Sequence, residues 1–426
     1  GVEGTGVCFS ASEGEKGMAV LNWLGPDVMD RELGLAFQMM EHMLLGMPAS
    51  PLRRALIESG LGEDIAGQGL ESELRQLSFD TGLKGIAVED APKVEALIMQ
   101  CLKDLAEKGL PGDVVEAAVN SVEFMLRENN SGRFPVGLHV MLRSLTTWLH
   151  DGDPLLPLCF EEPLQKIKDA IRAKTGYFEA LLKRWFVDNP HRVLVVLTPD
   201  PGLNRREEEA EKQTLSQVSA AMSDQDRKRV TSEAKALRKW QATPDSAEAL
   251  AAIPRVRPED LPSENAGIPT ERLEPAQPPT LFHPLPTNGI VYAEAAFELG
   301  AVPEYLLPLL PLFGRALLEM GTTKRDFVDL NMTIARKTGG MEVDTIFLTH
   351  ASSRNPVSRL ILSGKASPEK TDELFGLMTE VLVDARLDQK ERFSRMILEE
   401  KARQEHAIVP SGHMVVATRL RSAMSG

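Results

Sequence analysis

The sequence has few cysteines, no long apolar run and fewer basic than acidic residues, and each shortage excludes a class of protein. Its three cysteines, Cys8, Cys101 and Cys159, form no CxxC pair and are too few for a disulfide framework. They indicate a reducing compartment in which all three thiols are small core residues. The longest apolar runs, such as residues 306–313, are broken by proline and fall far short of the ~20 residues that a membrane-spanning helix needs.

The acidic balance argues against nucleic acid as the main partner. The 426 residues contain 48 Lys and Arg against 62 Asp and Glu, which gives a formal net charge of −14. Phosphate binding needs a concentrated basic patch, whereas a negative summed field favours cationic ligands. The content of 42% hydrophobic and 26% charged residues is typical of a soluble globular protein, and the length predicts two or three domains.

Hydrophobic periodicity predicts a first ordered region of strands and helices up to residue 202. One face of the segment 30–45 is apolar at helical spacing, and Gly46 ends that helix. Strands are predicted at residues 18–24, 74–88 and 191–197, and helices at residues 30–45, 51–57, 92–108, 112–128, 135–150 and 162–186.

The next stretch is polar and then proline-rich. Residues 205–250 are charged and nearly free of aromatics, which predicts an exposed helical hairpin, with Ser223 and Asp224 as a helix start between its two arms. Prolines recur between residues 254 and 286, and they indicate an extended linker without regular structure.

The order of predicted elements then repeats. Strands are predicted at residues 290–299, 343–349 and 358–363, and helices at residues 304–320, 324–336, 368–385, 388–406 and 411–424. This repetition indicates an internal duplication at an offset of roughly 270 to 280 residues. We call the two repeats the first copy and the second copy. The second copy lacks counterparts of residues 162–197, so we expect the chain to be an excerpt of a longer protein.

The predicted fold class is therefore α+β, with two duplicated α/β domains, each a mixed sheet packed by helices, joined by a helical hairpin linker. The predicted domains are residues 1–202, residues 203–286 for the hairpin and proline-rich linker, and residues 287–426 for a domain that is truncated at its C-terminus.

The segment containing Gln38, Glu41 and His42 is the most informative for chemistry. It resembles the pattern His-x-x-Glu-His, in which two histidines four residues apart bind zinc on one helical face while the glutamate polarises a water. Gln38 stands where the first histidine would be, and a carboxamide is a poor zinc ligand. We therefore interpret Gln38, Glu41 and His42 as a degenerate remnant of a metal site, and we predict neither catalytic nor metal-binding residues in this chain.

Several blocks in order make the sequence similar to the presequence proteases, the organellar branch of the pitrilysin and insulysin type of inverted zinc metallopeptidases. These blocks cover essentially the whole chain and are residues 44–53 (LLGMPASPLR), 58–62 (ESGLG), 127–132 (RENNSG), 317–322 (LLEMGT), 336–340 (RKTGG) and 411–413 (SGH).

The resemblance implies four related α/β domains in two halves that close around an unfolded peptide. It places the zinc motif on the first domain, and an Arg and a Tyr that assist the reaction on the fourth, so neither set lies in this chain. The parent protein is then expected to be a zinc metalloendopeptidase that degrades cleaved targeting peptides and other short unstructured peptides, with basic peptides favoured by the acidic balance. Its expected location is the mitochondrial matrix, the chloroplast stroma or both, without nucleic-acid or membrane partners.

Two alternatives accompany this interpretation. A natural chain with Gln38 in place of histidine would also suit a non-catalytic scaffold subunit related to these peptidases. Lys337-Thr338-Gly339 matches a triad of β-lactamase-like serine enzymes, but no Ser-Asp-Asn accompanies it, and a helix end followed by a glycine turn explains it better. The seven histidines other than His42 show no metal-ligand spacing and are expected to be surface or capping residues.

Overall fold

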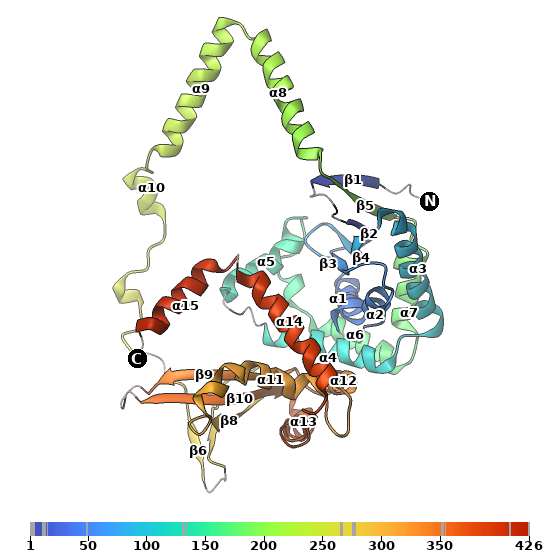
Figure 1. Ribbon diagram of the computed structural model, residues 1–426, viewed down its shortest axis with the longest axis vertical. Coiled ribbons are helices and arrows are strands. Elements are labelled where there is room, and N and C mark those ends of the chain that lie inside the picture. Colours follow the sequence, from blue (N-terminus) through green and yellow to red (C-terminus); the bar gives the residue numbers. More distant parts are fainter. Residues whose placement is uncertain are drawn as a thin grey trace. The chain divides into compact units, whose positions relative to one another are not determined.

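Figure 1 shows the computed structural model of the chain. It describes residues 5–10, 14, 16–47, 50–129, 132, 134–264, 267–274, 278–350, 353, 355–408 and 410–424, with the backbone alone at positions 5, 399, 402, 405–407 and 424. Four residues of the blocks quoted above, Pro48, Ala49, Asn130 and Ser131, lie outside the described residues.

The first copy is built on a five-stranded sheet. Its order is β1-β5-β2-β4-β3, and β2 pairs antiparallel with β4 and β5 while β3 pairs antiparallel with β4. Alternate residues of β2 are buried, including Ala19, Leu21 and Trp23, because successive side chains of a strand point to opposite faces. The strands are β1 (Thr5–Ser10), β2 (Gly17–Asp27), β3 (Asp64–Glu71), β4 (Gln76–Ile86) and β5 (Arg192–Asp200).

Helices and short turns complete the first copy. The expectation of a single helix over residues 162–186 is wrong. The helix is interrupted between α6 and α7, where Lys174 and Gly176 adopt positive φ angles of 51° and 66°. The helices are α1 (Arg31–Glu41), α2 (Pro51–Glu58), α3 (Ala91–Lys108), α4 (Gly112–Glu128), α5 (Val136–Trp148), α6 (Glu161–Arg172) and α7 (Tyr177–Leu182), with π-helical turns at His42–Gly46 and Lys183–Val187 and 3₁₀ turns at Val88–Asp90 and Leu156–Leu158.

Residues 199–286 form a separate compact unit together with residues 8–15. Ser223 caps the second long helix as expected, since its hydroxyl accepts from the Asp226 amide and the Asp226 carboxylate accepts from the Ser223 amide. The linker contains a two-stranded antiparallel sheet, whereas its prolines had predicted no regular structure. The paired residues lie between the prolines. The elements are α8 (Leu203–Ala221), α9 (Asp224–Ala242), α10 (Ala247–Ala252), a 3₁₀ turn (Pro258–Asp260), β6 (Glu271–Leu273) and β7 (Thr280–Phe282).

The second copy repeats the topology of the first. Its sheet has the order β8-β10-β9, which matches β2-β4-β3, and β10 begins 280 residues after β4, at residue 356 against residue 76. The elements are β8 (Val291–Glu298), a 3₁₀ turn (Glu304–Leu309), α11 (Leu310–Glu319), α12 (Phe327–Lys337), β9 (Met341–Thr349), β10 (Pro356–Ala366), a 3₁₀ turn (Pro368–Lys370), α13 (Thr371–Val383), α14 (Lys390–Ile408) and α15 (Gly412–Met424). The predicted α+β fold class with duplicated domains is confirmed.

Helix α4 of the first copy packs against α12 of the second. The Asn120 side chain donates to the carbonyl oxygens of Ala335 (2.8 Å) and Thr338 (2.6 Å) at the end of α12. Glu128 at the C-terminal end of α4 accepts from Tyr292 (3.0 Å) and Lys365 (2.5 Å), and burial together with this carboxylate raises the pKa of Tyr292 to about 12. The two copies are therefore joined by polar contacts at the middle and at the C-terminal end of one helix.

The α12 helix ends at Lys337 as expected from the glycines that follow. Thr338 is its cap residue, and Gly340 adopts a positive φ of 120°. A helix end and turn thus account for Lys337-Thr338-Gly339.

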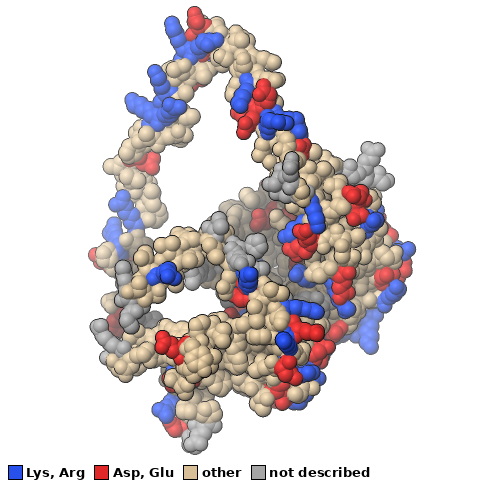
Figure 2. All heavy atoms as spheres, viewed as in Figure 1, with Lys and Arg blue, Asp and Glu red and all other residues tan. Residues whose placement is uncertain are grey.

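Charges of both signs lie side by side on the surface. Figure 2 shows Lys and Arg side chains among Asp and Glu side chains over one face of the molecule. The expectation of three core thiols is wrong: Cys8 and Cys159 are exposed and only Cys101 is half-buried, where burial raises the pKa of its thiol to about 11. Within the described residues, no helix combines the length and the apolar character that crossing a membrane requires.

Candidate functional site

Helix α1 carries the three residues of the degenerate motif. It begins at an N-cap, Asp30, whose carboxylate accepts from the Leu33 amide at 3.0 Å, and it continues into the π-helical turn His42–Gly46. Its buried face includes Phe37, whose ring stacks on Phe186 with centroids 5.7 Å apart. Because this apolar face fixes the helix against the core, Gln38, Glu41 and His42 lie half-buried at its edge.

Glu41 and His42 face different neighbours. A Cβ built at Gly69 of β3 would lie 2.9 Å from Glu41 Oε1, so the carboxylate rests against that strand. The His42 ring packs against the backbone of Gly46 in its own turn. Within the described residues, the side chains of Gln38, Glu41 and His42 form no hydrogen bond or ion pair with another residue.

Burial without polar partners shifts both titratable groups toward their neutral forms. Desolvation raises the pKa of Glu41 and lowers the pKa of His42. Neither shift involves a charged neighbour. Glu41 and His42 are therefore two poorly solvated polar side chains. Neither has an opposite charge beside it that would tune its pKa for proton transfer.

A cavity of about 480 Å³ opens beside these residues. It lies between α1, α4 and α5 and the turn at Leu156–Leu158. Gln38, Glu41 and His42 all line it, so the structure brings the whole predicted motif to one wall. His139 of α5 lines it too and is half-buried.

The residues present do not fit a zinc ion. A catalytic zinc needs three protein ligands with an open fourth position, whereas α1 offers one imidazole and one carboxylate that lie against different neighbours. Across the parts of the chain that the structure describes, no three His, Cys, Asp or Glu side chains come together in a way that could hold a metal ion.

Two arginines that the sequence reasoning missed also line the cavity. Arg31 from the first turn of α1 donates to the Cys159 carbonyl, and Arg143 of α5 donates to the Pro157 carbonyl at 2.9 Å. Nothing in the local pattern indicated that both guanidinium groups reach one turn, because that convergence depends on how α1 and α5 pack.

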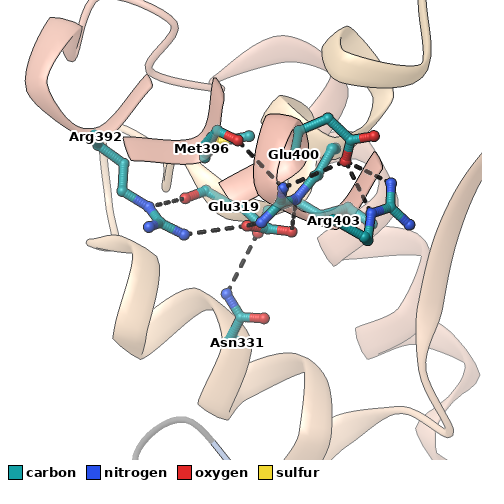
Figure 3. A network of polar contacts seen from close by, with 8 residues as sticks. Glu319, Asn331, Arg392, Met396, Glu400 and Arg403 are labelled. Carbon is teal, nitrogen blue, oxygen red and sulfur yellow. Dashed lines mark hydrogen bonds and ion pairs between the residues drawn. The ribbon is translucent and has the colours of Figure 1, made fainter. Parts of the chain in front are cut away.

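The corresponding face of the second copy is filled with ion pairs, as Figure 3 shows. Glu319 of α11 accepts from Arg315 at 2.6 and 3.0 Å and from Arg392 of α14 at 3.1 Å. Arg392 also lies over the Phe327 ring, 4.2 Å from its centroid, and Glu400 of α14 lies 3.8 Å from Arg315. This arrangement is a structural clamp between α11 and α14.

Comparison with known families defines the class of protein to which this fold belongs. The profile of the region associated with subfamily C of the M16 peptidases matches residues 197–426, and the profile described as Peptidase M16 inactive domain matches residues 3–122. The first covers more than half of the chain. The chain therefore belongs to subfamily C of the M16 peptidase family, and the segment with Gln38, Glu41 and His42 lies in its inactive-domain type.

Individual relatives are similar along nearly the whole chain. Presequence protease 1, chloroplastic/mitochondrial, of Arabidopsis thaliana is 40% identical over 96% of this chain and 38% of its own length. Protein HypA of Clostridium perfringens is 33% identical over 98% of this chain and 43% of its own length, and the mitochondrial presequence protease of Mus musculus is 25% identical over 95% and 39%. This chain thus spans about two fifths of the length of these relatives.

Solved structures with a similar chain path include pitrilysin. The crystal structure of pitrilysin covers 95% of this chain and 40% of its own, with 12% identity and a TM-score of 0.44. The periplasmic protease PqqL of Escherichia coli covers 98% of this chain and 44% of its own, with 14% identity and a TM-score of 0.31.

Proposed function

We propose that this chain is the central, non-catalytic part of a zinc metalloendopeptidase that degrades cleaved targeting peptides and other short unstructured peptides in an enclosed chamber. The observation that carries the proposal is the 40% identity to a presequence protease over 96% of the chain. Several relatives are named as mitochondrial, and one as chloroplastic and mitochondrial, which supports the mitochondrial matrix, the chloroplast stroma or both as the location.

The proposed domains are residues 1–202 as a non-catalytic peptidase-like domain, residues 203–286 as hairpin and linker, and residues 287–426 as a further peptidase-like domain. The repeated order of strands and helices, with sheets β2-β4-β3 and β8-β10-β9, supports this division. In this arrangement the chain supplies part of the chamber wall.

Zinc belongs, in this proposal, to the parent protein and to a segment other than this chain. Gln38, Glu41 and His42 are the remnant of a metal site that the duplication carried over and that has lost its function. Purified residues 1–426 should contain no stoichiometric zinc by elemental analysis and should cleave no peptide. Zinc near one equivalent per chain, lost in His42→Ala, would overturn this assignment.

A non-catalytic scaffold subunit is the second candidate, and Gln38 in place of a histidine is the observation that favours it. The sequence of the gene on the N-terminal side of residue 1 separates the two. An intact His-x-x-Glu-His there supports the peptidase, and a sequence without that motif supports the scaffold.

The preference for basic peptides rests on the excess of 62 acidic over 48 basic residues. A negative summed field would concentrate cationic peptides, and salt would screen that attraction. Cleavage of an Arg-rich and Lys-rich peptide by the full-length protein should slow as the salt concentration rises from about 0.05 to 0.5 M, more than cleavage of a neutral peptide of equal length. Equal salt dependence of the two peptides would remove the steering argument.

A further inference from the structure

The guanidinium group of Arg143 is a half-buried positive charge without a carboxylate partner. Its Nη1 donates to Asn129 Oδ1 at 3.3 Å and its Nη2 donates to the Pro157 carbonyl at 2.9 Å. Both acceptors are neutral, and within the described residues Arg143 takes part in no ion pair. Burial lowers the pKa of this guanidinium. A buried charge with only neutral partners is costly to the fold, so its presence beside a cavity points to an anionic ligand.

Arg31 lines the same cavity and binds the backbone next to the same turn. Its Nη2 donates to the Cys159 carbonyl, two residues beyond the carbonyl that Arg143 binds. Its Nη1 forms a long ion pair, at 3.8 Å, with the exposed carboxylate of Glu162. Its Nε is buried and has no hydrogen-bond partner within the described structure. Two guanidinium groups, one of them without a carboxylate partner, therefore line one cavity.

The rest of the cavity wall is mainly apolar. Glu41 is the one carboxylate among its described lining residues, and burial raises the pKa of this group, which favours its neutral form. A volume of about 480 Å³ lies in the range of small-ligand sites, which are largely apolar with a few polar groups that fix orientation. The apolar lining includes Leu35, Leu70, Leu77, Val122, Met125 and Leu126.

We propose that this cavity binds the C-terminal carboxylate of a short apolar peptide, with Arg143 and Arg31 holding the carboxylate and the α4 side holding the apolar side chains. The planar fork of a guanidinium matches the two oxygens of a carboxylate. The inference rests on the proposed function, because peptide hydrolysis creates a new C-terminal carboxylate on one product. A fatty acid would offer the same chemistry, a carboxylate on an apolar chain, and is the alternative source.

Binding to purified residues 1–426 tests the proposal without any hydrolysis or zinc. Three probes are titrated by calorimetry: N-acetyl-Ala-Leu-Leu with a free carboxylate, the same peptide as its C-terminal amide, and octanoate. The free acid should bind at least about tenfold more tightly than the amide, because a hydrogen bond to a charged group is lost. Equal affinity for acid and amide would overturn the carboxylate site. Binding of octanoate without binding of the peptide acid would overturn the assignment to peptide ends.

Two variants locate the binding. Arg143→Gln should weaken binding of the free acid about tenfold, whereas Arg172→Gln, which changes an exposed arginine of α6 paired with Asp169, should leave it unchanged. Gly34→Phe tests the site without changing either arginine, because Gly34 lines the cavity and a Cβ there meets no heavy atom within 4 Å, so the added ring should take up space that a ligand would need. Circular dichroism checks folding of each variant. Undiminished binding by Gly34→Phe would place the ligand elsewhere and sink the proposal.

The experiment distinguishes failure of this inference from failure of the proposed function. If the parent protein proves to be a scaffold, the titrations still report whether the cavity takes a carboxylate. If the free acid does not bind, the peptidase assignment keeps its own support from the relatives.

Discussion

The helix α1 of the first copy and the helix α11 of the second copy occupy the same position in the same topology, but the surroundings of their polar side chains are opposite. On α1, Glu41 and His42 lie beside a cavity without polar partners. On α11, Arg315 and Glu319 are tied to each other and to α14. Under the proposal that α1 carries the remnant of a metal site, the comparison indicates two routes by which a duplicated helix face loses its chemistry. It can keep polar residues without partners, or it can convert the face into an ion-paired contact.

The hydrophobic cores of the two copies also differ. The first copy is centred on aromatic rings, with Phe79 and Phe186 5.0 Å apart and Trp23 donating from its indole to the Phe186 carbonyl at 3.0 Å. The buried cluster of the second copy around β10, α12 and α13 is aliphatic, with members such as Leu362 and Leu374. The first copy therefore has the larger buried core and relies on it, while the second copy relies more on polar ties between helices.

The largest expected effect follows from this difference. Phe37 of α1 is 2% exposed and stacks on Phe186, whereas Phe313 of α11 is 38% exposed. We expect Phe37→Ala to lower the free energy of unfolding by about 3–5 kcal/mol, and Phe313→Ala by less than about 1 kcal/mol. Urea denaturation followed by tryptophan fluorescence and by circular dichroism measures both. Similar losses for the two variants would contradict the proposed difference between the cores.

Much of this comparison could be predicted from the sequence. The helical patterns of residues 30–45 and 304–320 predicted both helices, although the first turn of the second is 3₁₀, and the repeated order of elements predicted the duplication that the two sheets confirm. Ser223 was recognised as a helix start because its chemistry is local. Features that depend on neighbouring residues in the chain could thus be predicted from the sequence.

The features that the sequence did not predict depend on contacts between residues that are distant in the chain. Strand β3 was not predicted, because its sequence, DIAGQGLE, contains two glycines and little apolar alternation, and pairing with β4 alone makes it a strand. The cavity arginines and the clamp were also missed. Arg31 and Arg143 are 112 positions apart in the chain, and Glu319 and Arg392 are 73 apart, so no local pattern could join them. Gln38, Glu41 and His42 were found because one helical turn holds all three.

The second prediction compares one glutamate from each helix. Replacing Glu319 by Gln removes the charge that compensates Arg315 and Arg392, whose side chains are only 27% and 19% exposed. We expect a loss of about 1–2 kcal/mol in the free energy of unfolding, because both partly buried guanidinium groups lose the charge of a shared hydrogen-bond acceptor. Glu41→Gln should be neutral or slightly stabilising, since Glu41 has no partner to lose. A larger loss for Glu41→Gln than for Glu319→Gln would reverse the comparison between the two helix faces.

The smallest effect is a difference in the sign of pH dependence, and it compares Glu41 with Glu400. Burial raises the pKa of Glu41 in the folded chain, so ionisation costs stability as the pH rises above about 4.3, the usual value of an unfolded glutamate. Hydrogen bonds from Gln404 and Arg403 lower the pKa of Glu400, so its contribution is present above that value and is lost as the pH falls through the folded pKa.

Urea titrations at intervals between pH 3 and 7 separate these two behaviours. Relative to the parent chain, Glu41→Gln should gain stability as the pH rises through this range, by less than about 1 kcal/mol in total. Glu400→Gln should be less stable than the parent at pH 7, and this deficit should shrink toward pH 3, again by less than about 1 kcal/mol. The opposite slopes follow from one physical difference, since an unpartnered carboxylate prefers its proton and a paired one releases it. Parallel slopes for the two variants would show that Glu41 has a charged partner in solution, and the contrast between the cavity face of α1 and the clamp of α11 and α14 would then fail at its central residue.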